Sequence, residues 1–188
     1  MLHNTFCRRL AALVLTLAVA VSAVLPVFAV YPMPIQTATE TEAVYLFNAD
    51  TGKTLLTQNA DQPRYVASLT KMMTALLLLE SGKDLNGEVT VPTDLTQEFK
   101  DIQNANGTTM GLRIGETVRR IDLLNALLIT SANDAASVIA WDVGGSLNAF
   151  IQQMNARAAE LGCTSATFTC AHGLYDYGNV ASAEDMAK

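Results

Sequence analysis

The chain has 188 residues and is half hydrophobic, enough for one domain with a buried core. Its formal net charge is −6. Without residues 1–29, which hold two of the 12 basic residues and none of the 18 acidic ones, the charge becomes −8. No basic stripe remains, which argues against a nucleic-acid partner. His172 is the only histidine after residue 29, and no Cys/His cluster has zinc spacing, so we expect no metal ion or other cofactor.

Residues 1–29 have the features of a removable export signal. Arg8 and Arg9 precede an uncharged apolar run that begins at Leu10, and the segment ends at Val27-Phe28-Ala29 with small residues at the two positions that a signal peptidase reads. The apolar run is long enough for an uncleaved membrane helix to be the alternative. The short positive region and the small residues favour cleavage, so we expect a protein exported across the cytoplasmic membrane, on its extracytoplasmic side.

Residues 30–42 are rich in Pro, Thr and Gln and are interpreted as a tether. A folded region is expected to begin at residue 43. Residues 43–48 and 54–58 have the composition of β-strands, and residues 50–53 supply turn chemistry between them. The sequence therefore predicts a β-hairpin at the start of the domain.

Ser68 stands at the start of a long apolar run, with Lys71 three positions later. In a helix over this run the two residues share a face, with Cβ atoms roughly 5–6 Å apart. A hydroxyl with an amine in reach at a helix N-terminus is the arrangement of an activated nucleophile. A capping serine followed by a surface lysine explains the same four residues, and the pattern alone favours that simpler interpretation. Gly82 is expected to end the helix.

The centre of the chain is expected to be mostly helical. Residues 85–115 have no strong period and contain a β-like piece at 88–91. From Thr117 the apolar residues recur at helical spacing, with Asp122 near the helix start. The pattern breaks at residues 130–133 and then resumes as a second apolar helix that runs to Gly144-Gly145.

The last segment is expected to contain a helix, a short extended piece and the beginning of another helix. Ser146 is predicted to cap a helix that runs to Leu161, and residues 167–169 are predicted to be extended. Ser182-Ala183-Glu184-Asp185 is similar to a capping box, although the chain stops at Lys188. A hairpin and a helical lobe leave sheet edges and an open face, so we expect the chain to be the N-terminal portion of a longer protein.

Other residues receive simpler structural interpretations. Apolar helical faces predict core positions, and isolated arginines predict a solvated surface. The expected core residues are Trp141, Met72, Met73 and Met154, and the expected surface residues are Arg113, Arg119 and Arg120. Outside the cytoplasm Cys163 and Cys170 are able to pair, but the sequence does not establish their approach. His172 has no acid at a suggestive spacing, so a structural histidine is favoured over a Ser-His catalytic pair.

A second motif changes the interpretation of Ser68. Ser131-Ala132-Asn133 lies at the break between two apolar helices, where a hydroxyl and a carboxamide two residues apart can project into one cleft. The serine can relay a proton, and the amide can bind both a substrate carbonyl and a lysine. An ordinary polar connector is the alternative, because Ser and Asn are common in turns. The two motifs in this order, behind an export signal, favour catalysis.

With these motifs, the chain resembles the serine-type D-alanyl-D-alanine carboxypeptidases, the low-molecular-mass penicillin-binding proteins of peptidase family S11. The likeness covers roughly residues 43–188. Segments that resemble the family are Asn48-Ala49-Asp50-Thr51-Gly52-Lys53, Ala67-Ser68-Leu69-Thr70-Lys71, Ser131-Ala132-Asn133-Asp134-Ala135-Ala136, His172-Gly173-Leu174 and Ser182-Ala183-Glu184-Asp185-Met186-Ala187. The resemblance implies an α/β (α+β) fold of the β-lactamase and penicillin-binding-protein type, without its C-terminal strands.

The resemblance also implies a mechanism and a substrate. Ser68 would form an acyl-enzyme with a peptidoglycan stem peptide that ends in D-Ala-D-Ala, and β-lactams would acylate the same hydroxyl. Lys71 would act as the general base, Ser131 would relay a proton, and Asn133 would orient Lys71 and the substrate. The third box of the family, Lys-Thr-Gly, does not occur in the 188 residues. We therefore expect the chain alone to be inactive. A missing C-terminal segment is one possible means of membrane association.

Two other functions are compatible with the sequence. A class A-type β-lactamase shares the Ser-x-x-Lys motif, but it normally carries Asp at the middle of the second box, where this chain has Ala132. A non-catalytic peptidoglycan-binding relative or an inert fragment would also explain the missing third box.

Overall fold

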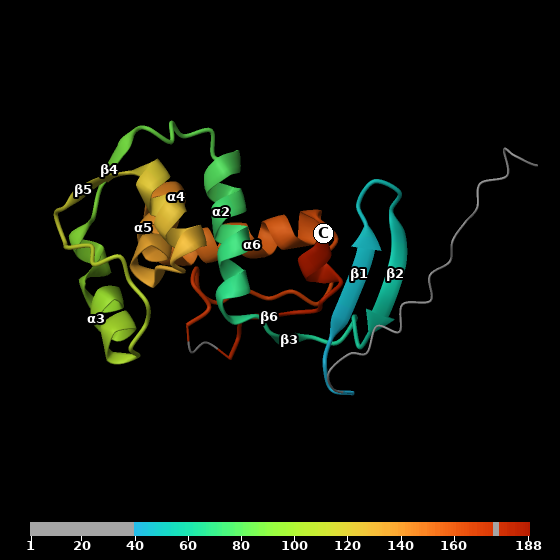
Figure 1. Ribbon diagram of the computed structural model, residues 1–188. Coiled ribbons are helices and arrows are strands. Elements are labelled where there is room, and N and C mark those ends of the chain that lie inside the picture. Colours follow the sequence, from blue (N-terminus) through green and yellow to red (C-terminus); the bar gives the residue numbers. More distant parts are fainter. Residues whose placement is uncertain (1–39, 175–176) are drawn as a thin grey trace, which may run out of the picture. The chain divides into compact units, whose positions relative to one another are not determined.

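The computed structural model describes residues 40–174 and 177–188, and the predicted export signal and most of the predicted tether lie outside these residues. Helices and three two-stranded antiparallel sheets make up the described part (Figure 1). The strands are β1 (Val44–Asn48), β2 (Lys53–Gln58), β3 (Arg64–Tyr65), β4 (Glu88–Thr90), β5 (Thr117–Arg119) and β6 (Val180–Ala181). The α-helices are α2 (Thr70–Glu80), α3 (Thr96–Asn104), α4 (Arg120–Ile129), α5 (Asn133–Gly144) and α6 (Leu147–Glu160). Three single turns of 3₁₀-helix are η1 (Ala67–Leu69), η2 (Thr93–Leu95) and η3 (Asp185–Ala187).

The predicted hairpin is present as β1 and β2. The two strands pair antiparallel from Val44 opposite Gln58 to Asn48 opposite Lys53, with an irregularity after Leu46. At the turn, the Asn48 side chain accepts a hydrogen bond from the Thr51 N–H at 2.9 Å. Such local bonds from an Asn side chain are a reason why Asn favours turns.

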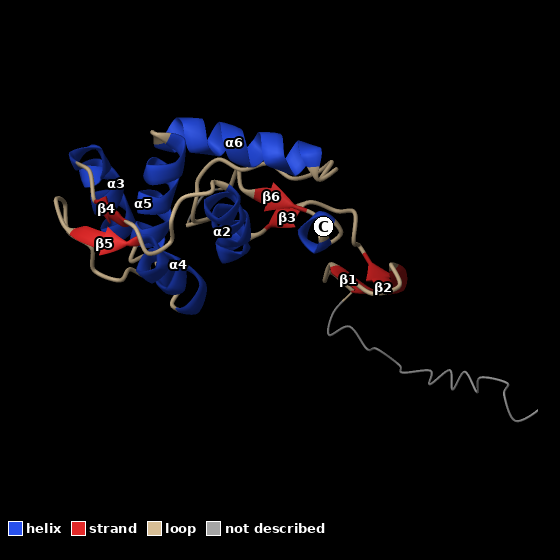
Figure 2. Ribbon diagram, turned by 90° about the horizontal axis from the view of Figure 1, so that it is seen from above, coloured by secondary structure: helices blue, strands red, loops and turns tan. Residues whose placement is uncertain are grey.

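Helix α5 is the centre of the helical lobe. It packs against α2, α3, α4 and α6, and its first eight residues, 133–140, are all buried (Figure 2). Small residues such as Ala135, Ala136 and Ala140 let the neighbouring helices approach closely. Leu78 and Phe150 are fully buried against this helix layer. The lobe therefore has a continuous apolar core, which holds the N-terminus of α5 in place.

The predicted helix boundaries in this lobe are largely correct. The Ser146 Oγ accepts a hydrogen bond from the Ala149 N–H at 3.1 Å, so Ser146 caps α6 as expected. Gly145 ends α5 with a left-handed φ of 74°. At Gly144 a Cβ would lie 2.7 Å from the backbone N of Phe150, so the turn between α5 and α6 has room only for glycine.

Two elements of the central segment differ from the prediction. Residues 96–104 form α3, where no helix was expected. Residues 117–119 form β5, which pairs with β4, so the following helix α4 begins at Arg120 rather than at Thr117. Phe99 and Ile102 are the only apolar residues of α3, which is too few for a helical period to be recognised in the sequence.

Two side-chain predictions were also wrong. Met72 was expected in the core but is 51% exposed, whereas Met73 and Met154 are buried. Arg120 was expected on the solvated surface, yet it makes a two-pronged ion pair with Asp142 at 2.7 and 2.9 Å, with only 14% of its side chain exposed. Sequence spacing does not reveal a partner 22 positions away. Arg113 and Arg119 are exposed and Trp141 is half-buried against the core.

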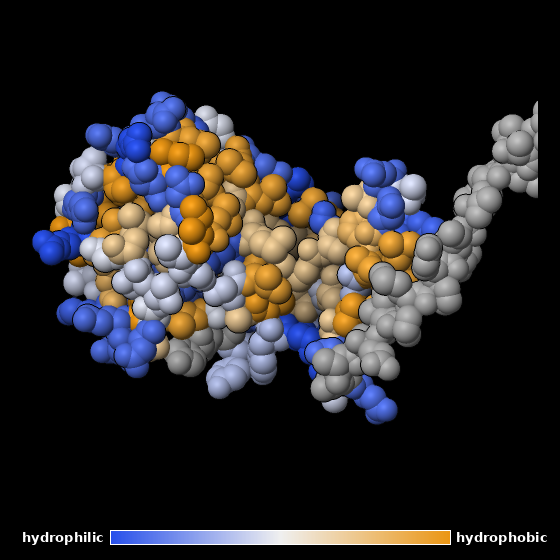
Figure 3. Space-filling view, viewed as in Figure 1, coloured by the Kyte–Doolittle hydropathy of each residue, from blue (hydrophilic) through white to orange (hydrophobic). Residues whose placement is uncertain are grey.

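Several large apolar side chains lie on the surface of the lobe. The face seen in Figure 3 has apolar patches around α2 and α4. The exposed large apolar residues of these two helices and of η1 are Leu69, Met72, Leu79, Leu128 and Ile129. Leu69 and Met72 lie next to Ser68 and Lys71 in the sequence, so apolar surface borders the residues of the first predicted motif.

Candidate active site

Ser68 lies at the junction between η1 and α2. It is the central residue of the single 3₁₀-turn Ala67–Leu69, which leads directly into α2. Ala67 has a φ of +45°, in the left-handed region that a residue with a Cβ seldom adopts. Such strain persists only where the surroundings enforce it, and it is common at functional sites. The predicted helix is thus confirmed, with Ser68 two residues before its first α-helical residue, Thr70.

Lys71 is buried in the first turn of α2 and points at three oxygen atoms. Its Nζ lies 2.8 Å from Asn133 Oδ1, 2.8 Å from the backbone O of His172 and 3.2 Å from Ser68 Oγ. None of these partners is a carboxylate. Burial disfavours the ammonium form and lowers the pKa of Lys71 to about 8, against a smaller opposite effect of Cys170.

This geometry would allow a neutral Lys71 to act as a base towards Ser68. The two shorter hydrogen bonds go to carbonyl oxygens, which only accept, so they use both N–H groups of a neutral amine. The remaining lone pair then faces Ser68 Oγ and can accept its proton. A lysine with a pKa of about 8 has a neutral fraction near physiological pH that an ordinary lysine lacks.

The second motif supplies the other two predicted side chains. Ser131, between α4 and α5, has a φ of +59°, and its Oγ donates a hydrogen bond to Ser68 Oγ at 2.9 Å. Asn133 is the first residue of α5, and its Oδ1 accepts from Lys71. The structure therefore brings together all four residues that the sequence predicted: Ser68, Lys71, Ser131 and Asn133.

A loop before β5 fixes the orientation of Asn133. The backbone O of Thr108 accepts hydrogen bonds from both the backbone N–H and the side-chain Nδ2 of Asn133, at 2.8 and 3.0 Å. Since the amide nitrogen is used there, the Oδ1 atom must face Lys71. At Gly107 a Cβ would lie 2.9 Å from Asn133 Nδ2, so this loop approaches the site closely.

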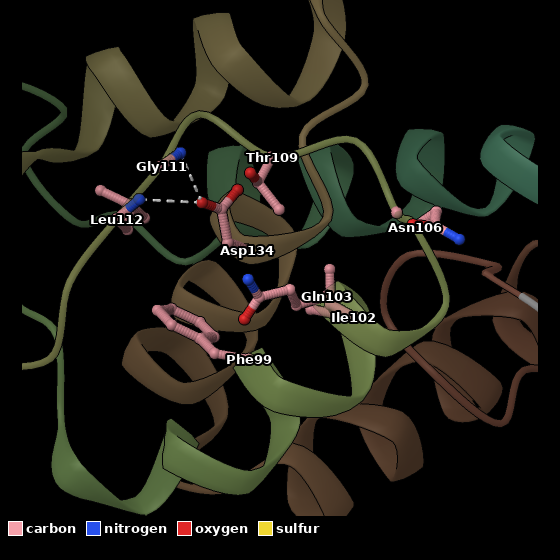
Figure 4. Close-up of a pocket in the computed structure, with 9 residues that line it drawn as sticks. Phe99, Ile102, Gln103, Asn106, Thr109, Gly111, Leu112 and Asp134 are labelled. Carbon is pink, nitrogen blue, oxygen red and sulfur yellow. Dashed lines mark hydrogen bonds between the residues drawn. The ribbon is translucent and has the colours of Figure 1, made fainter.

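Asp134 anchors the same loop on its other side. Its carboxylate accepts hydrogen bonds from the backbone N–H groups of Met110, Gly111 and Leu112, each at 3.0 Å. Figure 4 shows the last two of these bonds, at the edge of a cavity of about 460 Å³ between this loop and α3. No role for Asp134 is predicted from the sequence. In the sequence, Asp134 is recognisable as an acidic residue in the first turn of a helix. This position does not predict which loop its carboxylate binds.

His172 and Gly173 close the site from the opposite side. The carbonyl of His172 binds Lys71, and the carbonyl of Ala171 accepts from Thr74 Oγ1 at 2.6 Å. Gly173 has a φ of +76°, and a Cβ there would clash with the backbone O of Ala67. The ring of His172 is hydrogen-bonded to Glu98 and Cys170, so this residue supports Lys71 through its backbone.

Ser68, Lys71 and Ser131 line an open hollow of about 420 Å³. Apolar residues from η1, α2 and α4 form the rest of its wall: Val66, Ala67, Leu69, Met72, Leu127 and Leu128. A hydroxyl nucleophile at the base of a largely apolar hollow is accessible to a small substrate. Among residues 40–174 and 177–188, no group of three or more His, Cys, Asp or Glu side chains is placed to hold a metal ion.

A family model described as D-alanyl-D-alanine carboxypeptidase, of peptidase family S11, matches residues 31–188. The chain belongs to this family. The fold is correspondingly similar to solved members of the wider group. The Streptomyces K15 DD-transpeptidase matches 76% of this chain and 56% of its own, with a TM-score of 0.68 and 31% identity. Penicillin-binding protein 6B from Escherichia coli matches 72% of this chain and 44% of its own, with a TM-score of 0.67 and 31% identity.

Curated relatives carry two kinds of name. The D-alanyl-D-alanine carboxypeptidase DacF of Bacillus subtilis is 33% identical over 150 residues, which are 80% of this chain and 38% of the relative. A D-alanyl-D-alanine endopeptidase of Pseudomonas aeruginosa is 32% identical over 174 residues, which are 93% of this chain and 53% of the relative. The chain thus spans roughly 40–50% of the length of these two relatives. The predicted family and the predicted penicillin-binding-protein fold are both confirmed.

Two further predictions concerned a disulfide and a membrane helix. Cys163 and Cys170 are both free thiols, so the disulfide that the sequence left open is not formed. In the part of the chain that the structure describes, none of the helices has the length and apolar character needed to span a membrane.

Proposed function

We propose that Ser68 is the acylated nucleophile of a serine D,D-peptidase and that Lys71 is its general base. The hydrogen bonding of Lys71 carries this proposal. Its two short hydrogen bonds go to the carbonyl oxygens of Asn133 and His172, so the lone pair of a neutral Lys71 Nζ would face Ser68 Oγ. Family membership supports a bond next to a D-alanine as the target. The substrate is then a peptidoglycan stem peptide that ends in D-Ala-D-Ala.

In the first half of the reaction, Ser68 Oγ attacks the carbonyl carbon of the penultimate D-alanine while Lys71 takes the hydroxyl proton. The tetrahedral oxyanion forms next to the start of α2, where the backbone N–H of Ser68 and the helix dipole favour negative charge. The C–N bond then breaks. The terminal D-alanine leaves with a proton that Ser131 passes on, because Ser131 Oγ is 2.9 Å from Ser68 Oγ.

In the second half, water attacks the acyl-enzyme with Lys71 again as the base, and Ser68 regains its proton. Asn133 keeps Lys71 in place through Oδ1 and presents one amide hydrogen towards the substrate. A β-lactam, which resembles D-Ala-D-Ala, opens on Ser68 in the same way. Its acyl-enzyme is expected to hydrolyse slowly. Rapid turnover would instead favour the β-lactamase alternative.

The proposed domain organisation places residues 1–29 as an export signal, 30–42 as a tether and 43–188 as the nucleophile-bearing part of the catalytic domain. The relatives are bacterial cell-wall peptidases, which supports an extracytoplasmic location. The Lys-Thr-Gly box that grips the substrate carboxylate in this family does not occur in the 188 residues. We therefore propose that full activity needs a longer form that contains this box.

Labelling with a fluorescent penicillin tests the proposal. The 188-residue chain and a form extended through a Lys-Thr-Gly box are compared, each as the parent and as Ser68→Ala. Ser81→Ala, at the other end of α2, is the matched control because it removes the same hydroxyl away from the site. We expect labelling of the extended form that Ser68→Ala abolishes and Ser81→Ala preserves. An unlabelled extended parent would refute the enzyme, and strong labelling of the 188-residue chain would refute the need for the third box.

A further inference from the structure

Cys170 lies in a second polar cluster, on the side of His172 away from Ser68. The Cys170 Sγ is 3.6 Å from His172 Nδ1, and His172 Nε2 is 2.9 Å from Glu98 Oε1. A thiol, an imidazole and a carboxylate in this order form the arrangement of an activated cysteine, in which the carboxylate orients the imidazole and the imidazole accepts the thiol proton. These three residues come from two distant segments, α3 and the loop before β6.

Two further N–H groups point at the same sulfur atom. The Gly173 N–H lies 3.2 Å from Cys170 Sγ, and Asn179 Nδ2 lies 2.9 Å from it. The orientation of Asn179 is fixed, because its Oδ1 accepts from the backbone N–H of Thr169 at 2.7 Å. One of its amide hydrogens is therefore directed at the sulfur, where it stabilises a thiolate more than a thiol.

The charges around Cys170 also favour the thiolate. Lys71 on α2 and His172 face it as potential cations, and Glu98 on α3 balances His172. Burial opposes ionisation, but the hydrogen bonds from His172 and Gly173 outweigh it and lower the pKa of Cys170. Burial likewise opposes protonation of His172, yet its bonds with Cys170 and Glu98 raise its pKa to about 9. The Leu174 N–H, 3.0 Å from Nδ1, favours the neutral ring and reduces this effect.

Cys170 lines a small cavity. Cys170 and Glu98 line a space of about 190 Å³ together with residues of the first half of α6, Leu147, Asn148 and Ile151. Cys170 itself is partly exposed. The cavity is different from the hollow at Ser68, because the two share no lining residue. A small neutral molecule fits its size and avoids repulsion by Glu98.

We propose that Cys170 is a reactive thiol, activated by His172 and Glu98, that undergoes exchange with small neutral disulfides entering this cavity. The Cys170 sulfur attacks one sulfur of the disulfide, and a new S–S bond forms while the old one breaks. The second sulfur leaves as a thiolate that takes one proton, from His172 or from solvent. Cys170 is oxidised to a mixed disulfide as the reagent is reduced, so no other oxidant is needed.

Cys163 is a natural internal control for this reaction. It is also partly exposed, but its sulfur lies next to the backbone O of Asp185 at 3.5 Å, and burial together with Asp185 raises its pKa. The two cysteines are therefore expected to differ in reactivity although both are free thiols in the same chain. The comparison does not depend on acylation of Ser68, so it stands or fails separately from the proposed enzyme activity.

The test uses 4,4′-dithiodipyridine, a neutral aromatic disulfide, on the chain with Cys7→Ser so that two thiols remain. Stopped-flow absorbance of the released thiopyridone gives the rates, and Cys163→Ser and Cys170→Ser assign them. At pH 6 we expect Cys170 to react at least about 10-fold faster than Cys163, because a thiol with an unshifted or raised pKa is almost fully protonated there. In urea the two rates should converge. Equal rates in the folded chain would overturn the proposal.

Glu98→Gln tests the role of the carboxylate, and Asp101→Asn is the matched control because it removes an equal charge from an exposed position of α3. Glu98→Gln is expected to slow Cys170 about 3- to 10-fold at pH 6 and to make its rate rise with pH, since the imidazolium loses its partner. Asp101→Asn should leave the rate unchanged. Equal effects of the two variants, with circular dichroism confirming both folds, would refute the proposed activation.

Discussion

Helix α5 joins two buried regions of opposite character. Its body packs into the apolar core with Leu78, Leu123 and Phe150, whereas its first residue, Asn133, belongs to the polar cluster around Lys71. In the core, stability comes from apolar area removed from water. In the cluster, a potential cation is buried against carbonyl and hydroxyl oxygens without a carboxylate, which costs stability and produces a base.

The cluster also contains unfavourable local geometry that the core lacks. Ala67 and Ser131 both have a positive φ, and each is at or next to a proposed catalytic residue. The buried hydroxyl of Thr70 has no hydrogen-bond partner among the described residues. The comparison indicates that the rigid core supplies the free energy that holds the site in this unfavourable but reactive arrangement.

The largest effect on the free energy of unfolding is expected from shortening a side chain of the apolar core. Phe150→Ala removes a fully buried ring between α5 and α6 and should lower the free energy of unfolding by about 3–5 kcal/mol. Leu128→Ala, at a position of α4 that is 57% exposed, should change it by less than about 0.5 kcal/mol. Urea unfolding monitored by circular dichroism measures both, and similar losses would contradict the assignment of the core.

An intermediate effect on the free energy of unfolding is expected at Gly173, which lies against the backbone of Ala67. Gly173→Ala adds a strained φ and a clash with the backbone next to Ser68, and should cost roughly 2–3 kcal/mol. Gly52→Ala is the matched control, because its φ of +67° is similar but the space around it is open, so only about 1 kcal/mol is expected. In a form that is labelled by penicillin, Gly173→Ala should also reduce labelling at least about 10-fold. Equal costs for the two variants would exclude the clash.

The effect expected at Lys71 is different in kind, because it depends on pH. Since the pKa is about 8 when folded and 10.5 in its ordinary state, the unfolded chain binds more protons between these values. Stability conferred by Lys71 therefore rises with pH from about 8 to 10.5, by at most about 1.4 kcal/mol per pH unit. Below pH 8 Lys71 is protonated in both the folded and the unfolded chain. Burial of its charge then lowers the stability of the folded chain by the full amount.

Lys71→Met removes this titration, so the stability of the parent minus that of the variant should become more positive as the pH rises across the same window. Unfolding by urea at pH 7, 8.5 and 10 measures it, with Lys53→Met as an exposed-lysine control. In a penicillin-labelled form the acylation rate of the parent should rise with pH and level off above about 8, because only neutral Lys71 is a base. A pH-independent stability difference would refute the lowered pKa.

The order of the two motifs was sufficient to predict the family and the four site residues, because the reacting groups are side chains at fixed spacings on helices. Ser68 and Lys71 are neighbours on one helical face, so local geometry alone places them together. The hairpin, the Ser146 cap and the end of α2 near Gly82 were predicted for the same reason: each depends on a few adjacent residues.

The sequence by itself therefore determined the local elements and identified Ser68, Lys71, Ser131 and Asn133 as the candidate site residues. Tertiary structure alone decided which backbone atoms surround Lys71, because the His172 carbonyl comes from 101 positions away and any residue type offers a carbonyl. It likewise decided the Arg120–Asp142 pair, the loop held by Asp134 and the meeting of Glu98 with His172 and Cys170. Long-range contacts of this kind leave no periodic pattern, since only the packing of α3, α5 and the loop before β6 creates them.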